Sequence, residues 1–350
     1  MKRFAFLMVV VSALLFGACD KDDPKDNLEI SENLQNIGFN VILKTYEDLK
    51  DKAADLQAAC ATLQNTPSLA NLQIARAAWV AARAPWEQSE GFLFGPVDQE
   101  GLDPSLDSWP VNVTDLNNVL ASGNAITPTF LSNQEGTLKG FHTIEYLLWG
   151  TNGQKQVGAF TAREFEYLAA CAAVLASDAA QLFSLWDLSD GKYVSNLVNA
   201  GASSSIYVSQ KAALEEMTNG LIVIADEVGN GKINEPLATQ DLTLEESRFS
   251  ANSKADFADN IRSIRNIYLG MYLNFGDQKG ISDIISERDA ALDTQIKTQI
   301  DEAIAAIIAI PGTFSDAVIN NQAAVTTAQT KVRTLQETLE SKLLPLVSGL

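Results

Sequence analysis

Apolar residues recur with a helical period along most of this chain, whereas the alternating pattern of half-buried strands is scarce. The periodic segments are rich in Ala, Leu, Gln and Glu, which favour helices. They predict helices over residues 33–64, 68–92, 136–149, 161–187, 205–229, 254–276, 282–310 and 314–344. Because these helices divide evenly about residue 190, we expect an all-α fold of two packed helical bundles, residues 33–190 and 191–350.

Two connections between the predicted helices are long. One covers residues 93–113 and the other residues 230–253. Loops of this length in a helical protein are usually functional or disordered, and Trp109 and Phe249 within them favour order. We therefore expect two long ordered loops that lie near a site between the bundles.

The N-terminus has the features of a bacterial lipoprotein signal. The basic letters "MKR" and a short apolar run precede the small residues "GA" and Cys19. This resembles a lipobox, in which the cysteine is acylated; an ordinary secretion signal with a chance cysteine is the alternative. We predict a signal peptide over residues 1–18, a lipidation site at Cys19 and a charged tether over residues 19–32. The protein would then be held in the cell envelope by a lipid anchor, on the periplasmic or the surface-facing side of the outer membrane.

The chain is acidic, with a formal net charge of −19. Removing the predicted signal peptide also removes two basic residues, so the mature chain is more acidic still. This charge argues against nucleic acid and anionic membrane surfaces as partners, and it suits cations.

Two cysteines follow the predicted lipidation site. Cys60 and Cys171 both lie in alanine-rich helical segments. We expect buried free thiols, although export would permit a disulfide between them.

The only histidine of the chain, His142, lies three residues before Glu145. On a helix both fall inside a broad apolar arc, one turn apart. An ionised carboxylate in such a place is costly without a partner. Glu145 therefore needs His142, a charge from another helix, or a metal ion. The spacing alone does not decide between a hydrogen-bonded structural pair in the core and a ligand or metal site.

A second pattern lies on the helix predicted over residues 68–92. Charged and aromatic residues share one stripe there, namely Arg76, Trp79, Arg83, Glu87 and Glu90. A salt-bridged face in solvent would explain the stripe, but tryptophans such as Trp79 and Trp86 rarely line a wholly solvated face. A shorter polar stripe, which a surface helix would also explain, consists of Asp256, Asn260 and Ser263.

A single histidine excludes several classes of metalloenzyme. It cannot supply an HExxH motif, a three-histidine zinc site or a triad of two histidines and one carboxylate. Ferritin-like di-iron bundles need an ExxH pair on each of two helices, and this chain has one pair, reversed. It also contains no Walker loop or dinucleotide-binding fingerprint.

The segment "GFHTIEYLLWG" resembles the GxHxxE motif of the imelysin family, the group of insulin-cleaving membrane proteases. Four further segments resemble recurrent segments of that family in the same order, and they read "PWEQSEGFLFGPV", "LDPSLDSWPV", "EVGNGKI" and "ESRFSANSKADFADNI". The resemblance covers most of residues 33–345. It implies two helical bundles with the motif near their interface, and a lipoprotein linked to iron uptake. Some members carry a peptidase label.

The resemblance also implies where the site lies. Gly140, His142 and Glu145 are the motif itself, and Gly140, without a Cβ, would let another helix approach. The expected metal ligands are His142, Glu145, Glu87 and Glu90. The expected lining of the ligand pocket is Arg83, Trp86, Asp107, Trp109, Gly140, Ser247, Asp256 and Asn260.

One imidazole among many carboxylates suits iron, manganese or calcium better than a thiolate-type zinc site. We therefore expect a divalent metal, iron first, or an iron-bearing ligand as the bound species, and iron-uptake proteins as partners. Two alternatives stay open. One is a metallopeptidase, which needs a water-activating base and an open cleft; the other is a binding scaffold that uses no metal.

The lipid anchor can be tested with Cys19→Ala. The variant should be released from the membrane fraction and should escape lipoprotein signal-peptide processing, because the acylated thiol is absent. Fractionation and lipid labelling measure both effects. A Cys19→Ala protein that still carries lipid and sediments with membranes would contradict the lipoprotein prediction.

Overall fold

The computed structural model describes residues 30–277 and 279–350. The predicted signal peptide and Cys19 lie outside the described residues, as does the tether up to residue 29. The first described helix begins at Ser31, two residues before the predicted start at residue 33. In the described part of the chain the fold is helical, with one isolated bridge between Tyr272 and Phe275 and no strand. The all-α prediction is confirmed.

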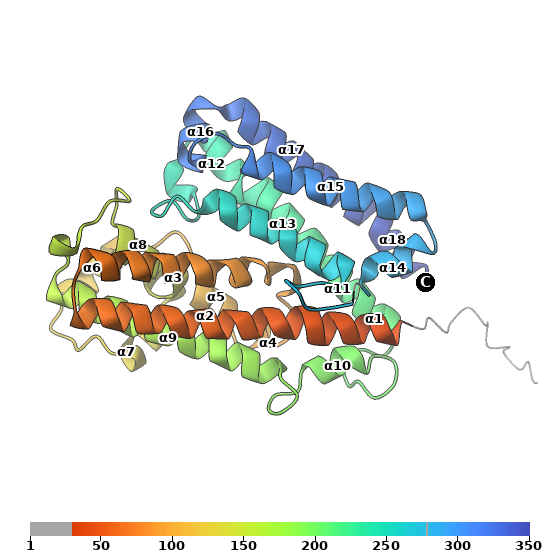
Figure 1. Cartoon of the computed structure of the whole chain (residues 1–350), viewed down its shortest axis with the longest axis horizontal. Helices are drawn as coiled ribbons and strands as arrows, with labels where there is room; N and C mark the ends of the chain where they lie inside the picture. Colours follow the sequence, from red (N-terminus) through yellow and green to blue (C-terminus); the bar gives the residue numbers. More distant parts are fainter. Residues whose placement is uncertain (1–29, 278) are drawn as a thin grey trace, which may run out of the picture.

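The first half of the chain forms one group of packed helices (Figure 1). Helix α1 (Ser31–Asn36) continues through the π-helical segment η1 (Ile37–Ile42) into α2 (Leu43–Asn65). Helix α2 packs against α3 (Leu69–Glu87) and α9 (Ala162–Trp186), and α8 (Gly140–Trp149) packs against α3 and α9. A capping box between Thr161 and Glu164 starts α9.

The second half forms another such group. Helix α13 (Ser253–Leu269) packs against α11 (Gln210–Asp226) and α15 (Ala290–Ile308), and α17 (Gln322–Thr338) packs against the same two helices. The remaining helices of this group are α12 (Asn234–Thr239), α14 (Ile281–Ser286), α16 (Phe314–Asn320) and α18 (Leu344–Ser348), whereas α10 (Val194–Val198) packs against α1 and η1 of the first group (Figure 1). Helices α3 and α13 lie side by side and join the two halves (Figure 1). The division into domains near residue 190 stays a prediction.

The segments expected to be long loops are ordered, but they contain short helices. Residues 93–113 include α4 (Pro96–Gln99) and α5 (Leu102–Asp107), and α6 (Val113–Ala121) and α7 (Pro128–Ser132) follow. Residues 230–253 include the end of the π-helical segment η5 (Glu227–Lys232) and α12. Proline at the first turn of α4 and α7 is compatible with a helix start. These helices are too short to show an apolar period, so the sequence pattern does not predict them.

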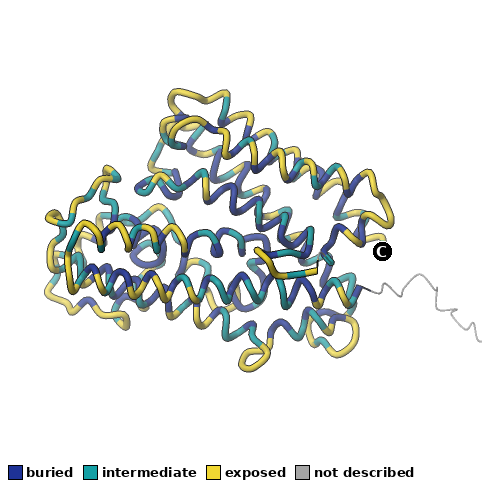
Figure 2. Tube along the Cα trace, viewed as in Figure 1, coloured by how far each residue is buried: buried dark blue, intermediate teal, exposed yellow. Residues whose placement is uncertain are grey.

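Buried residues line the facing sides of the helices and form one continuous hydrophobic core (Figure 2). Cys60 and Cys171 lie in it as free thiols, as expected. Helix α9 is long and apolar enough to cross a membrane, but half of its apolar stretch is buried inside the fold. The core helix of a soluble protein passes the same test.

Gly140 starts α8 with a positive φ of 76°. A Cβ there would collide with the carbonyl oxygens of Ser105 and Leu106 in α5. The prediction that Gly140 allows another helix to approach is confirmed. The close contact brings the C-terminal end of α5, with Asp107, next to the first turn of α8, with His142.

Gly140→Ala should therefore destabilise the protein. The positive φ alone costs a residue with a Cβ about 1–3 kcal/mol, and the collision with α5 adds to this. Urea unfolding of the variant measures the loss. Gly158→Ala is the matched control, because a Cβ at Gly158 meets nothing within 4 Å. Equal stability of both variants would show that α5 and α8 do not need this contact.

Candidate metal centre

Polar side chains from distant parts of the chain converge between α3, α5, α8 and α13. All of them are buried. They are Arg83 and Glu87 from α3, Glu90 just after it, Asp107 from α5, His142 and Glu145 from α8, Lys232 from η5, Glu246 and Ser247 from the segment before α13, and Asp256 and Asn260 from α13. Their burial excludes the reading of the α3 stripe as a solvated face.

His142 is held by a carboxylate on each ring nitrogen. Its Nε2 atom lies 3.1 Å from Oδ1 of Asp107, and its Nδ1 atom lies 3.2 Å from Oε2 of Glu145. The other oxygen of Glu145 accepts hydrogen bonds from the backbone N–H and the hydroxyl of Ser250, both 2.7 Å long. Glu145 is thus fixed from two sides, and it fixes the orientation of the imidazole ring.

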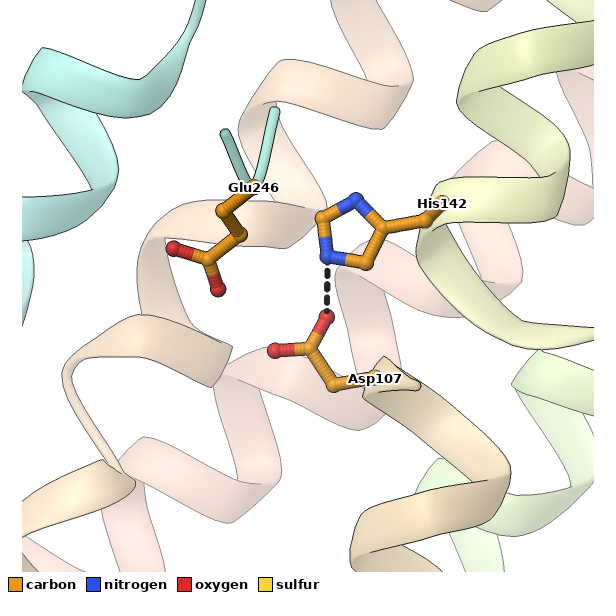
Figure 3. A group of neighbouring side chains, drawn as sticks. All are labelled: Asp107, His142 and Glu246. Carbon is orange, nitrogen blue, oxygen red and sulfur yellow. Dashed lines mark ion pairs between the residues drawn. The ribbon is translucent and has the colours of Figure 1, made fainter. Parts of the chain in front are cut away.

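Asp107, His142 and Glu246 form a compact group of metal-ligand side chains (Figure 3). One donor atom from each lies within 4.8 Å of the other two. The Oε2 atom of Glu246 is buried and has no hydrogen-bond partner among the described residues. Because such an oxygen is costly to bury alone, it supplies a free donor for a cation at this point.

Arg83 connects the acidic side chains around this group. Its guanidinium forms ion pairs with Asp107 and Glu87, and it lies 3.3 Å from Glu246. It also lies 3.5 Å from Asp256. The Nε1–H group of Trp86 donates to the second oxygen of Asp107 at 2.6 Å. Asp107 is therefore held in place by three different residues when His142 is included.

Lys232 has a similar role on the other side of the cluster. Its Nζ atom lies 2.8 Å from Glu90, 3.0 Å from Glu246 and 3.7 Å from Glu87. The side-chain amide of Asn260 donates to both Glu87 and Glu90. Glu246 Oε1 thus contacts both Lys232 and Arg83, whereas its Oε2 atom stays without a donor.

Buried carboxylates outnumber buried cations in this cluster. The carboxylates are Glu87, Glu90, Asp107, Glu145, Glu246 and Asp256, and the basic side chains are Arg83, Lys232 and His142. Burial raises the pKa of Glu90 well above its ordinary value, and it raises the pKa of Asp256 to about 6 although Arg83 opposes the change. These two carboxyl groups therefore take up protons at higher pH than exposed carboxyl groups do.

The pKa values of Asp107 and His142 move in opposite directions. Burial alone would raise the pKa of Asp107, but Arg83 and His142 hold it well below its usual range. Burial alone would lower the pKa of His142, but Asp107 and Glu145 raise it to about 9. These two residues therefore form an ion pair at neutral pH.

The structure gathers the predicted site residues in one place. Trp109, from the predicted loop, lies with its ring 6.0 Å from that of His142, and Ser247 is fully buried in the segment before α13. The residues that sequence reasoning missed are Glu246, Lys232 and Ser250. All three lie within or beside the segments "EVGNGKI" and "ESRFSANSKADFADNI", but no period in those segments shows which side chains face inward.

Known proteins resemble this chain over nearly its whole length. The family model described as imelysin matches residues 42–341. The "Iron-regulated protein A" of Synechococcus elongatus is 31% identical over 339 residues, which cover 96% of this chain and 91% of that protein.

Solved structures resemble it as well. An iron-regulated protein A precursor from Parabacteroides distasonis is 29% identical with a TM-score of 0.81, and the match covers 89% of this chain and 93% of that one. An imelysin-like protein from Psychrobacter arcticum shares the fold at 14% identity, with a TM-score of 0.75 and coverage of 91% and 95%.

The raised pKa of His142 predicts a pH-dependent stability. Because its folded-state pKa is about 9 and its ordinary value is 6.5, the stabilisation is complete below pH 6.5 and is lost as the pH rises through 9. With a chelator present, the melting temperature of the wild type should fall towards that of His142→Gln between these pH values. Parallel melting curves for the two proteins across this range would contradict the assignment.

Proposed function

The chain belongs to the imelysin family, and we propose that it is an envelope lipoprotein that binds a divalent metal ion, ferrous iron first, at the group Asp107, His142 and Glu246. The observation that carries this proposal is the free Oε2 oxygen of Glu246, which is buried beside an imidazole and a second carboxylate. Three donors come from three separate segments, so the site exists only in the folded chain.

The charges of the cluster support a cation. Each carboxyl proton that the metal-free cluster holds can be exchanged for positive charge from the ion, and metal binding should release protons. A set of one imidazole and several carboxylates suits Fe²⁺ or Mn²⁺. Calcium prefers a site made wholly of oxygen donors, so the participation of His142 favours a transition metal.

The other predicted ligands have distinct places in this proposal. Glu145 contacts Nδ1 of His142, where a carboxylate fixes the ring and leaves Nε2 to face the ion. Glu87 and Glu90 form a neighbouring group with Asp107 that also meets the spacing of metal ligands. They are held by Arg83, Lys232 and Asn260, and they supply negative charge next to the ion.

The link to iron uptake comes from the relatives. The names of two similar proteins describe them as iron-regulated. With Cys19 acylated, the metal centre would stand on a lipid anchor at the outer membrane, where it could take up iron and pass it to uptake proteins. An iron-bearing small ligand remains a variant of the same proposal.

The cavity that reaches the cluster is small. It has a volume of about 230 Å³ and includes Glu90 and Asp107 among its lining residues. Ligand pockets for small molecules usually measure about 300–1,000 Å³. This size favours an ion over a stretch of polypeptide, and it is the reason to prefer metal binding to the metallopeptidase alternative.

Anaerobic calorimetry with Fe²⁺, and in parallel with Mn²⁺, tests the metal centre. Glu246→Gln and His142→Ala should each lower the affinity by at least ~10-fold, since even residues that only support ligands cost this much. Both variants should keep their helical fold. Glu245→Gln is the matched control, because Glu245 is also buried but bonds Ser253 and Ser315 outside the cluster.

Two results would favour the alternatives. A His142→Ala protein that melts far lower than the wild type yet binds metal equally well would make the His142–Glu145 pair purely structural. Chelator-sensitive cleavage of an unfolded protein substrate, lost in Glu145→Gln, would establish a metallopeptidase.

A further inference from the structure

Four of the eight residues that line the cavity beside the proposed metal centre are acidic. Asp103 and Glu227 lie half-buried at its outer part, and Glu90 and Asp107 lie buried at its inner part. Its lining residues include no basic side chain. The cavity therefore leads from solvent to Asp107, which belongs to the proposed metal centre.

Lys232 lies between the cavity and the proposed centre. Its ammonium group contacts Glu90 at 2.8 Å and Glu227 at 3.8 Å on the cavity side. The same group lies 3.0 Å from Glu246 on the inner side. The positive charge of the Lys232 side chain is thus already stabilised between the cavity and the proposed metal centre.

Trp109 also lies between the cavity and the proposed metal centre. Its ring lines the cavity, lies 6.0 Å from the ring of His142, and lies 5.3 Å from the ammonium group of Lys232. Trp86 donates a hydrogen bond to Asp107. Two indole rings therefore stand next to the proposed ion and can report its arrival.

We propose that this cavity is the entrance through which the divalent ion reaches Asp107, His142 and Glu246, and that Asp103 and Glu227 attract the ion into it. The proposal rests on the metal-binding function proposed above. Clefts lined by charge of one sign concentrate counter-ions and raise association rates by about 10- to 1,000-fold. Because Asp103 and Glu227 lie outside the ligand group, they act on the rate of entry rather than on coordination.

The test compares rates of metal binding. Wild type and the double variant Asp103→Asn/Glu227→Gln are mixed with Fe²⁺ under anaerobic conditions, and quenching of tryptophan fluorescence is followed by stopped flow. At low ionic strength the association rate constant of the variant should fall about 10-fold, with little change in the dissociation rate constant. The difference should shrink in high salt, which screens exposed charges.

Neither carboxylate accepts a hydrogen bond from the described residues. Glu227 contacts Lys232 at 3.8 Å, but Lys232 keeps its closer partners Glu90 and Glu246, so the double variant should fold normally. The control is Asp301→Asn/Glu302→Gln on α15, which removes the same charge from exposed positions away from the cavity. This control should bind Fe²⁺ at the wild-type rate.

The possible outcomes separate the two proposals. The entrance proposal is wrong if the wild type binds Fe²⁺ and the cavity variant associates equally fast. It is also wrong if the control variant slows as much as the cavity variant. In both cases the proposed metal centre is unaffected. If the wild type shows neither quenching nor heat of binding, the metal centre fails and the entrance fails with it.

Discussion

The structure depends on keeping charged groups stable in a place from which water is excluded. Arg83 does this for four carboxylates at once, and its partners lie on α3, on α5, in the segment before α13 and on α13 itself. Removing one member of a buried ion pair typically costs about 3–5 kcal/mol. A single guanidinium thus links helices from both halves of the chain, and the same contacts that join them build the site.

The excess of carboxylates over cations connects this packing to function. Burial raises the pKa values of Glu90 and Asp256 even though Lys232 and Arg83 lie beside them and oppose the change. Arg83 and Lys232 fix one oxygen of Glu246, and the other oxygen has no hydrogen-bond partner among the described residues. A cluster that is already held in this way would reduce the reorganisation that the proposed metal binding requires.

Sequence reasoning found the long helices and part of the site, for physical reasons. Apolar periodicity spans many residues in α2, α9 or α13, so those helices were predictable. His142 and Glu145 were recognisable because two polar residues share an apolar helical arc. Glu246 was not, because it lies in a segment without a period, and a contact between residues 107 and 246 is set only by how α5 and α13 pack. The helix predicted over 282–310 is in fact two helices, α14 and α15. The sequence did not predict this break because the apolar pattern continues across it.

Gly140 shows how narrowly the site depends on that packing. Its missing Cβ lets the carbonyl oxygens at the end of α5 contact the start of α8, and the next residues along, Asp107 and His142, then lie 3.1 Å apart. A wider separation would leave His142 without one of the two carboxylates that raise its pKa, and it would leave Asp107 with less positive charge around it. The glycine and the histidine of the GxHxxE motif therefore serve one purpose, which is to bring an imidazole and a carboxylate from different helices together in the core.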